Sequence, residues 1–367
     1  MSDAQQRKRF MQMALALGRR GQGLTWPNPA VGCVIVNQGR VVGRGWTQAG
    51  GRPHAEVVAL AEAGDKARGA DVYVTLEPCA HHGKTPPCVG ALIEAGVGQV
   101  FVATGDPDPR TNGKGIAALR DAGIAVTEDV EGAAARHDHA GFMHRVQDGR
   151  PLVTLKLAMT VDGRIATPAG ESKWITGAAA RRKVHIQRST HDAVLVGAGT
   201  VRADDPSLTV RDIGARRQPV RVVLSRGLNF PVPCRLSETM AEAPFWVVHG
   251  AEPSADAKAA LLEAGVKLME APSEAGALDL NATLRLLGSE GLTRVYCEGG
   301  GQLAASLLSA GLVDELVVFT AGKLIGADGV SGVAALGLHA LADAPRFTLL
   351  ESAVLGDDVM HRWGRQS

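Results

Sequence analysis

The sequence predicts two α/β domains joined in one chain. Its 367 residues are too many for one ordinary hydrophobic core. Apolar runs of strand length alternate with helical patterns in both halves, which is typical of sheets covered by helices. A polar stretch punctuated by Gly and Pro, residues 144–151, interrupts this alternation. We therefore place the two domains at residues 1–147 and 151–367.

The first half begins with a predicted amphipathic helix, because Phe10, Met13, Ala14 and Leu17 recur at helical spacing. A predicted hairpin follows, and helices and strands then alternate, so we expect a three-layer α/β domain. The expected elements are strands at 31–36 and 41–46 around a turn at 37–40, a helix at 54–64, a strand at 71–79, a helix at 88–97, a strand at 99–107, and a helix and strand within 115–126.

The second half restarts the alternation and predicts a second α/β domain. Helical stretches lie between several of its strands. The expected strands fall at residues 152–160, 191–197, 219–225, 244–250, 293–300 and 315–321.

Composition excludes several classes of partner. A net charge of +1 gives no general attraction for nucleic acid or anionic lipid, and an aromatic content of 4% is too low for a base-stacking platform. Gln12 interrupts the apolar run near the N-terminus, and no apolar stretch is long enough to span a membrane. Five cysteines without disulfide-framework spacing favour a reducing, cytoplasmic setting. We expect neither a nucleic acid nor a membrane as partner.

Two short motifs in the first half predict a catalytic zinc site. PHAE contains His54 and Glu56, and LEPCAHHGKTPPC contains Cys79 and Cys88. The zinc-deaminase signature is H-x-E…P-C-x-x-C, although eight residues separate the two cysteines here. A catalytic zinc takes three protein ligands and leaves one position for water, beside which a carboxylate must transfer protons. We therefore predict His54, Cys79 and Cys88 as zinc ligands and Glu56 as the catalytic acid and base.

Three other interpretations of these residues were weighed. A disulfide between Cys79 and Cys88 conflicts with a reducing setting. A structural zinc site would need a fourth ligand, for which His81 or His82 is available, but it would leave Glu56 unexplained. Buried cysteines can also simply pack, without metal. The remaining cysteines lie on apolar strands or in loops without partners and are interpreted as structural: Cys33, Cys234 and Cys297.

A glycine-rich turn in the second half is a candidate phosphate site. CEGGGQLAAS, at 297–306, follows a predicted strand and opens a predicted helix. Its glycines let the backbone approach a phosphate at the helix N-terminus. VGAGTVRADDP, at 196–206, has a similar arrangement, but it lacks the third glycine of the Rossmann fingerprint. Strand–Gly–helix turns are also often no more than turns.

Motifs along nearly the whole chain resemble one family. WPNPAVGCVIV, PHAEVVAL, YVTLEPCAHHGKTPPC and DPDPRTNGKG are similar to the deaminase half of the bifunctional riboflavin-biosynthesis deaminase/reductase. LKLAMTVDGRIAT, GESKWITG, HDAVLVGAGTVRADDPSLTVR and EGGGQLAASLLSAGLVDEL resemble its reductase half. Cytidine and tRNA-adenosine deaminases have the tighter cysteine pair. The resemblance implies a cytidine-deaminase-like fold followed by a dihydrofolate-reductase-like fold.

The resemblance also implies two consecutive reactions. Zinc-dependent hydrolysis removes the 2-amino group of 2,5-diamino-6-ribosylamino-4(3H)-pyrimidinone 5′-phosphate, and NADPH then reduces the ribosyl group, giving 5-amino-6-ribitylamino-uracil 5′-phosphate. It implies one Zn²⁺ per deaminase domain, bound NADPH or NADP⁺, a phosphorylated small molecule as substrate, and a homo-oligomer that is a dimer or larger.

Family motifs assign further site residues by resemblance. Segments expected to bind substrate contain Asn28, His81 and Lys84 in the first domain and Ser172, Arg188, Leu208, Arg211 and Glu298 in the second. Segments expected to bind NADP contain Ala158, Trp174, Thr200, Asp204, Ser225, Gly300, Gly301, Gln302, Leu303, Ala304, Ala305 and Ser306. TNGKG, at 111–115, departs from the usual family loop, so its contacts stay open.

Several of these assignments have plainer alternatives. Asn28 lies between two prolines and could be an ordinary turn residue. Arg188 and Arg211 suit phosphate because a guanidinium fork matches its oxygens, but each could be a solvated surface charge. Trp174 could belong to the core. Lys156 and Asp162 are expected near the hydride-transfer site, with the proton donor left open.

Two other functions compete with this interpretation. A nucleic-acid-editing deaminase with an attached binding domain is opposed by the eight-residue cysteine spacing and the near-neutral charge. A chain in which one domain is active and the other only binds or assembles is opposed by the complete zinc motif and, more weakly, by the Gly-rich and Arg positions.

Overall fold

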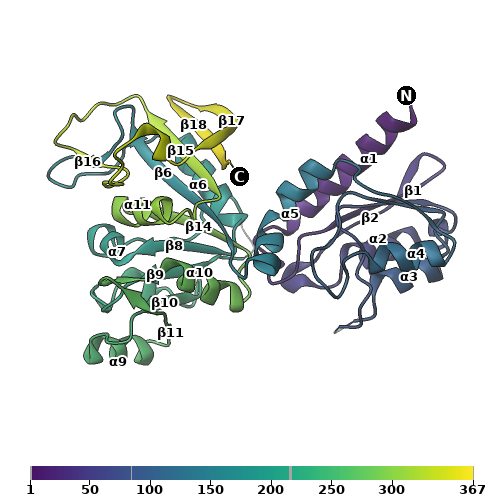
Figure 1. The fold of residues 1–367 in the computed structure, drawn as a ribbon, viewed down its shortest axis with the longest axis horizontal. Helices are drawn as coiled ribbons and strands as arrows, with labels where there is room; N and C mark the ends of the chain where they lie inside the picture. The colour runs from purple at the N-terminus through teal and green to yellow at the C-terminus, as the bar shows by residue number, and fades with distance from the viewer. Residues whose placement is uncertain (1, 84, 215–216, 367) are drawn as a thin grey trace. The chain divides into compact units, whose positions relative to one another are not determined.

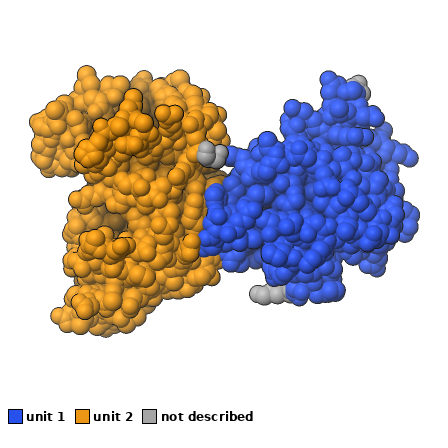
Figure 2. All heavy atoms as spheres, viewed as in Figure 1, with its two compact units in different colours: residues 1–149 blue, residues 150–367 orange. Residues whose placement is uncertain are grey.

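The computed structural model describes residues 2–83, 85–214 and 217–366, and it divides into two compact units. Unit 1 comprises residues 1–149 and unit 2 residues 150–367, as coloured in Figure 2. The division falls within the polar stretch at 144–151. The first part of that stretch is helical, however, because helix α5 (Gly132–Gln147), which we did not predict, continues through it.

Unit 1 is built on a five-stranded sheet with the order β2-β1-β3-β4-β5. Strands β1 and β2 of this sheet are labelled in Figure 1. Strand β1 pairs antiparallel with β2 and β3, whereas β3, β4 and β5 are parallel. The strands are β1 (Gly32–Asn37), β2 (Arg40–Trp46), β3 (Asp71–Val74), β4 (Gln99–Val102) and β5 (Ala125–Thr127), and the other helices of the unit are α1 (Asp3–Gly18), α2 (Ala55–Ala63), α3 (Cys88–Ala95) and α4 (Lys114–Asp121).

Alternating side chains of β1 divide the core of unit 1 in two. Cys33 and Ile35 pack in a cluster with apolar residues of α2, α3 and α4. Val34 and Val36 point to the opposite face, where they pack with α1 and the start of α5. Successive strand residues face opposite sides of a sheet, so a sheet buried on both faces needs apolar residues at every position. The expected three layers are confirmed.

The buried face of α1 is rotated from the predicted one. Met11 and Leu15 are buried together with Phe10 and Ala14, whereas Met13 and Leu17 are only partly buried at the border of the cluster. The apolar run is continuous from Met13 to Leu17, so its periodicity alone did not show which residues of the helix face the core.

Unit 2 is built on a nine-stranded sheet with the order β11-β10-β9-β8-β14-β6-β15-β18-β17. The strands from β11 to β15 in this order are parallel, and the antiparallel hairpin β18–β17 completes the edge. The strands are β6 (Leu152–Thr160), β8 (Ala193–Gly197), β9 (Val220–Leu224), β10 (Phe245–His249), β11 (Lys267–Glu270), β14 (Arg294–Gly299), β15 (Glu315–Ala321), β17 (Phe347–Leu355) and β18 (Asp358–Arg365).

Helices of unit 2 bury apolar faces against this sheet. Val201 of α7, Leu236 of α8 and Leu261 of α9 share one core cluster with strand residues, and Ala180 of α6 packs in another with β15. The helices are α6 (Ala178–Ser189), α7 (Ala198–Asp204), α8 (Arg235–Glu238), α9 (Ala255–Glu263), α10 (Leu280–Ser289) and α11 (Gly301–Ser309). Two short ladders pair β7 (Arg164–Ala166) with β16 (Val330–Ser331) and β12 (Ser273–Glu274) with β13 (Ala277–Leu278).

No helix in the part of the chain that the structure describes combines the length and apolar character needed to cross a membrane.

Candidate active sites

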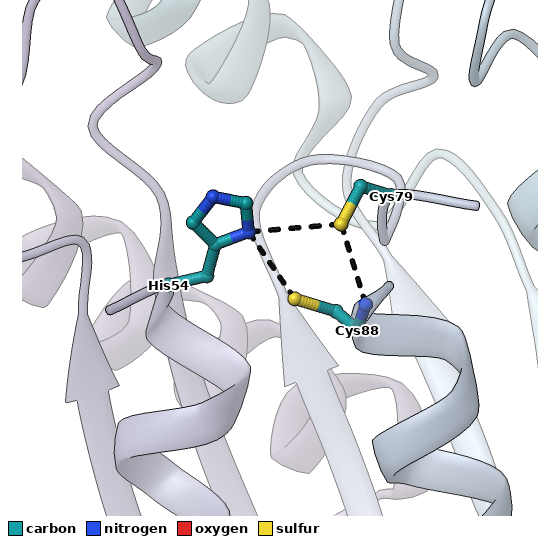
Figure 3. Close-up of side chains that lie close together, drawn as sticks. All are labelled: His54, Cys79 and Cys88. Carbon is teal, nitrogen blue, oxygen red and sulfur yellow. Dashed lines mark hydrogen bonds between the residues drawn. The ribbon is translucent and has the colours of Figure 1, made fainter. Parts of the chain in front are cut away.

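Three side chains from separate elements of unit 1 meet in one cluster (Figure 3). His54 is the N-cap of α2, Cys88 is the first residue of α3, and Cys79 lies in the loop after β3. Nδ1 of His54 is 3.3 Å from Sγ of Cys88 and 3.6 Å from Sγ of Cys79. The backbone N–H of Cys88 donates to Sγ of Cys79 at 3.3 Å. The predicted helix starts at His54 and Cys88 are confirmed.

The spacing and chemistry of this cluster fit a zinc ion. One imidazole nitrogen and two sulfurs lie within 4.8 Å of one another. Tetrahedral bonds of about 2.0–2.3 Å from zinc to nitrogen and sulfur require ligand atoms about 3.5 Å apart. Among the described residues, the cluster contains three ligands, whereas His81 places its Nδ1 3.2 Å from Oγ1 of Thr111. Three protein ligands leave one position for water.

The two thiols of the cluster are coupled. Hydrogen bonding with Cys88 is the main cause that lowers the pKa of Cys79, to about 4, and hydrogen bonding with His54 adds to it. The same interaction with Cys79, followed by burial, raises the pKa of Cys88. The pair therefore favours a thiolate at neutral pH, which is the form that binds metal.

Glu56 occupies the first turn of α2 and is only 4% exposed. Burial raises the pKa of its carboxyl to about 7, the negative charge at Cys79 adds to the increase, and His54 opposes it. Because a general acid or base works best when its pKa is near the working pH, this carboxyl is suited to proton transfer. It lies beside the cluster without belonging to its ligand set.

The other residues expected to bind the deaminase substrate have varied positions. The side-chain N–H of Asn28 donates to the carbonyl of Gly51 at 2.8 Å, so it holds the loop that leads to His54. Gly51 has φ +85°, and a Cβ there would lie 2.3 Å from the Asn28 amide. His81 is half-buried, and Lys84 lies outside the described residues.

Two acidic residues near the cluster were missed in the sequence. Glu77 is buried two positions before Cys79 and accepts several main-chain hydrogen bonds. Asp106 is also buried, and its pKa is raised to about 7 by burial and by the charges of Asp108, Glu77 and Cys79. The motifs LEPC and GDPDP contain these residues, but only their burial distinguishes them from surface carboxylates.

Three charged side chains of unit 2 form a largely buried cluster where β6 and β14 lie side by side, with side-chain exposures of 16% for Lys156, 11% for Arg188 and 9% for Glu298. Arg188 donates to both carboxylate oxygens of Glu298, to Oε1 through Nε and to Oε2 through Nη2, the latter at 3.0 Å. Arg188 also donates to the carbonyl of Thr209 at 2.7 Å, and Nζ of Lys156 lies 3.8 Å from Glu298 Oε2. Burial raises the pKa of Glu298, but Arg188 and Lys156 outweigh it and lower the value to about 2.

This pairing changes the interpretation of the two arginines. The guanidinium of Arg188 is occupied by protein acceptors and is not a solvated surface charge. Arg211 is exposed, and its Nη1 donates to Oγ of Ser207 at 2.6 Å. Arg211 is therefore the freer of the two to meet a phosphate.

The Gly-rich turn forms a cradle between β14 and α11. Gly299 and Gly300 have φ values of +67° and +85°, which favour glycine. Oγ1 of Thr200, in α7, donates to the carbonyl of Gly299 at 3.1 Å. A Cβ on Gly300 would lie 3.4 Å from Oγ1 of Thr200. The two turns expected to bind NADP are thus in contact. Glycines of positive φ just before the N-terminus of α11 fit a phosphate-bearing cofactor at that helix end.

The remaining residues expected in the reductase site differ in their solvent exposure. Trp174 is 62% exposed and stacks with Arg181, whose Cζ is 4.5 Å from the ring centre, so the alternative of a core Trp174 is wrong. Leu208 is buried in the core instead. In addition, Asp204, Gln302 and Ser306 are exposed, Ala158, Ser172, Gly301 and Leu303 are half-buried, and Ser225, Ala304 and Ala305 are buried.

The fold and the two sites define a zinc-deaminase domain followed by a reductase domain. Residues 4–104 match the family model described as the cytidine and deoxycytidylate deaminase zinc-binding region, and residues 151–361 match the RibD C-terminal domain. The chain belongs to the RibD family of riboflavin biosynthesis proteins. It is an enzyme with deaminase and reductase activities, and the expected fold class is confirmed.

Relatives match along almost the full length. Riboflavin biosynthesis protein RibD of Escherichia coli is 42% identical, over 95% of this chain and 97% of that protein, and RibD of Haemophilus influenzae is 43% identical over 95% of each. The structure of Acinetobacter baumannii RibD has a TM-score of 0.89 at 38% identity. That of a Thermotoga maritima diaminohydroxyphosphoribosylaminopyrimidine deaminase/5-amino-6-(5-phosphoribosylamino)uracil reductase has 0.87 at 34%, and both cover 100% of each chain.

Proposed function

We propose that unit 1 hydrolytically deaminates 2,5-diamino-6-ribosylamino-4(3H)-pyrimidinone 5′-phosphate and that unit 2 then reduces the ribosyl group of the product with NADPH. The observation that carries the first step is the cluster of His54, Cys79 and Cys88 beside the buried Glu56. The activities for which the Thermotoga maritima relative is named support the choice of substrate.

In the deaminase step, His54, Cys79 and Cys88 would hold one Zn²⁺ per unit. Zinc, when bound, supplies Lewis acidity that makes a water molecule a strong nucleophile at neutral pH. Glu56 would accept a proton from the attacking water and donate a proton to the departing amine. A carboxyl with a pKa of about 7 is able to do both.

In the reductase step, the turn at Gly299–Gly301 and the adjoining start of α7 would hold NADPH, which would supply the hydride. The same site includes Trp174, Ser225 and the other residues expected to bind NADP. Arg211 is suited to the substrate phosphate because its guanidinium is exposed. Arg188, Lys156 and Glu298 form a largely buried charged cluster that orients the sugar.

We also infer the setting of the enzyme. Its partner is a phosphorylated small molecule rather than nucleic acid or a membrane, since the net charge is only +1. A cytoplasmic homo-oligomer, a dimer or larger, is expected from the family resemblance. The deaminase would act on a small-molecule metabolite and not on polynucleotides.

Ammonia release tests this proposal for unit 1. The purified, zinc-loaded protein is incubated without NADPH with the diaminopyrimidine ribotide, and in parallel with cytidine and adenosine nucleotides and single-stranded RNA. We expect ammonia from the ribotide alone. Release from RNA or from the common nucleotides, and not from the ribotide, would overturn the proposed substrate.

A further inference from the structure

Glu77 joins the metal-ligand loop to a distant segment of unit 1. Its side chain is only 3% exposed and accepts four main-chain hydrogen bonds. Oε2 accepts from the N–H groups of Asp106 at 3.3 Å and Gly113 at 3.0 Å. Oε1 accepts from those of Gly115 at 2.9 Å and Ile116 at 3.2 Å. One carboxylate thus holds both ends of the segment 106–116.

Helix α4 begins within this segment, and the hydrogen bonds to Glu77 stabilise its N-terminus. The first N–H groups of a helix have no carbonyl partner within it, and its N-terminus carries partial positive charge. The carboxylate of Glu77 supplies acceptors and the opposite charge. Gly115 lies so close that a Cβ on it would be 2.1 Å from the carbonyl oxygen of Pro78. The start of α4 therefore packs directly on the backbone next to Cys79.

The tethered segment brings polar groups to the metal cluster. Asp106 is buried near Cys79 and Glu77, whose charges act on it. Thr111 is fully buried, and its hydroxyl lies 3.2 Å from Nδ1 of His81. The segment 106–116 and the stretch from Glu77 to Cys88 therefore touch at two places, one held by Glu77 and one by His81.

We propose that Glu77 is a positioning residue for the deaminase, holding the segment 106–116 as one wall of the substrate site beside Cys79. This inference rests on the proposed deaminase function. Glu77 acts on the segment and not on the metal, because its side chain bonds none of the three ligands. The separate main-chain bond from its N–H to the carbonyl of Thr104, at 2.9 Å, does not depend on the side chain.

The substitution Glu77→Gln tests the role. An amide keeps the size of the side chain but turns an NH2 group toward two backbone N–H donors, so half of the tether is lost. We expect the KM for the diaminopyrimidine ribotide to rise about tenfold or more, because small misplacements of a binding wall are costly. The kcat, the zinc content and the reductase activity should change far less. Amide hydrogen exchange should accelerate within 106–116.

Two further variants separate positioning from general stability. Val36→Ala truncates a buried residue of β1 on the sheet face covered by α1, opposite the core cluster of α2, α3 and α4, so it should lower the melting temperature and leave KM unchanged. Glu77→Asp keeps the charge on a shorter side chain and should give a KM between those of the wild type and Glu77→Gln. If Glu77→Gln does not fold, Glu77→Asp carries the test by the same criteria.

The outcomes are distinct. Wild-type protein that does not deaminate the ribotide contradicts the proposed function itself. If the wild type is active, an unchanged KM in the Glu77 variants, with only a lower melting temperature, overturns the positioning role. Loss of zinc from the Glu77 variants also overturns it, because Glu77 would then support the ligands and not the segment.

Discussion

Nδ1 of His54 lies 3.3 Å from the sulfur of Cys88, although 34 positions separate the two residues. Both residues stand at the N-terminal ends of helices, α2 and α3, whose apolar residues share one core cluster. A helix N-terminus favours an anion, so the fold itself stabilises a thiolate at this point. The site is therefore a consequence of how two helices pack on one face of the sheet.

Removing one sulfur should remove the metal and one activity only. We expect Cys88→Ala to reduce zinc from about one ion per chain to near zero, since two ligands cannot hold a catalytic zinc. Deamination should be lost, whereas reduction of the deaminated ribotide persists. Metal analysis checks this. Cys33→Ala, a buried cysteine of the same unit outside the cluster, is the matched control and should keep its zinc.

Glu56→Gln should separate metal binding from catalysis. The amide retains the shape of the side chain but cannot transfer a proton, so kcat for deamination should fall by about 10²–10⁴-fold. Zinc content and reduction of the deaminated ribotide should stay at wild-type levels. Glu62→Gln alters an exposed carboxylate on the same helix, paired with Arg44, and serves as the control. Substantial deamination by Glu56→Gln would contradict the role of Glu56.

Breaking the largely buried ion pair of Arg188 and Glu298 in unit 2 should lower its stability markedly. Arg188→Met leaves the Glu298 carboxylate with a weaker ion pair, in which Nζ of Lys156 is 3.8 Å from Oε2 of Glu298. Removing one partner of a buried ion pair typically costs about 3–5 kcal/mol. The double variant Arg188→Met/Glu298→Gln should be less destabilised than the single one. Chemical denaturation in a double-mutant cycle measures the difference.

The exposed pair between Arg44 and Glu62 provides the comparison for this cycle. Both side chains are largely solvated, so Arg44→Met should cost at most about 1 kcal/mol. If Arg188→Met cost no more than Arg44→Met, the buried charges would not be structurally coupled as described.

Unit 2 should lose stability in mild acid because of His191. Its Nδ1 lies 2.7 Å from the carbonyl of Gln187 and its Nε2 3.0 Å from the hydroxyl of Thr154. Burial lowers the pKa of its imidazole from 6.5 to about 4. The folded state thus favours the neutral ring, and its contribution is present above pH 6.5 and is lost as the pH falls through about 4.

A pH series of denaturation curves measures this effect. The shift corresponds to roughly 3 kcal/mol of unfolding free energy at full development. His191→Gln should be less stable at neutral pH but should lose less stability between pH 6.5 and 4. His339→Gln, an exposed position in the same unit, should follow the wild-type curve. Parallel slopes for the wild type and His191→Gln would contradict the assignment.

Local patterns were enough to predict the elements that carry the deaminase cluster. The helix starts at His54 and Cys88 follow from sequence signals that act over a few residues. Helix α5 was missed because its sequence, GAAARHDHAGFMHRVQ, contains two glycines and six charged or titratable residues. These residues weaken the helical period of the apolar side chains. Tertiary packing, not propensity, decides such a helix.

Contacts between distant positions could not be predicted in this way. Arg188 and Glu298 are 110 positions apart, and each alone has the pattern of a solvated charge. Glu77 reaches Gly113 across 36 positions, and only the closed fold reveals that its carboxylate is buried. Burial decides whether a charged residue is structural, and burial depends on the topology of the whole sheet.

The masses of the products formed with and without NADPH test the central claim most directly. Purified protein is incubated with the diaminopyrimidine ribotide and sampled by mass spectrometry. The account predicts replacement of an NH by an oxygen without NADPH, followed by the gain of two hydrogens once NADPH is added. Two outcomes with folded, zinc-loaded protein would contradict the proposed sequence of two reactions. One is that the undeaminated ribotide gains the two hydrogens, and the other is that the ribotide is neither deaminated nor reduced.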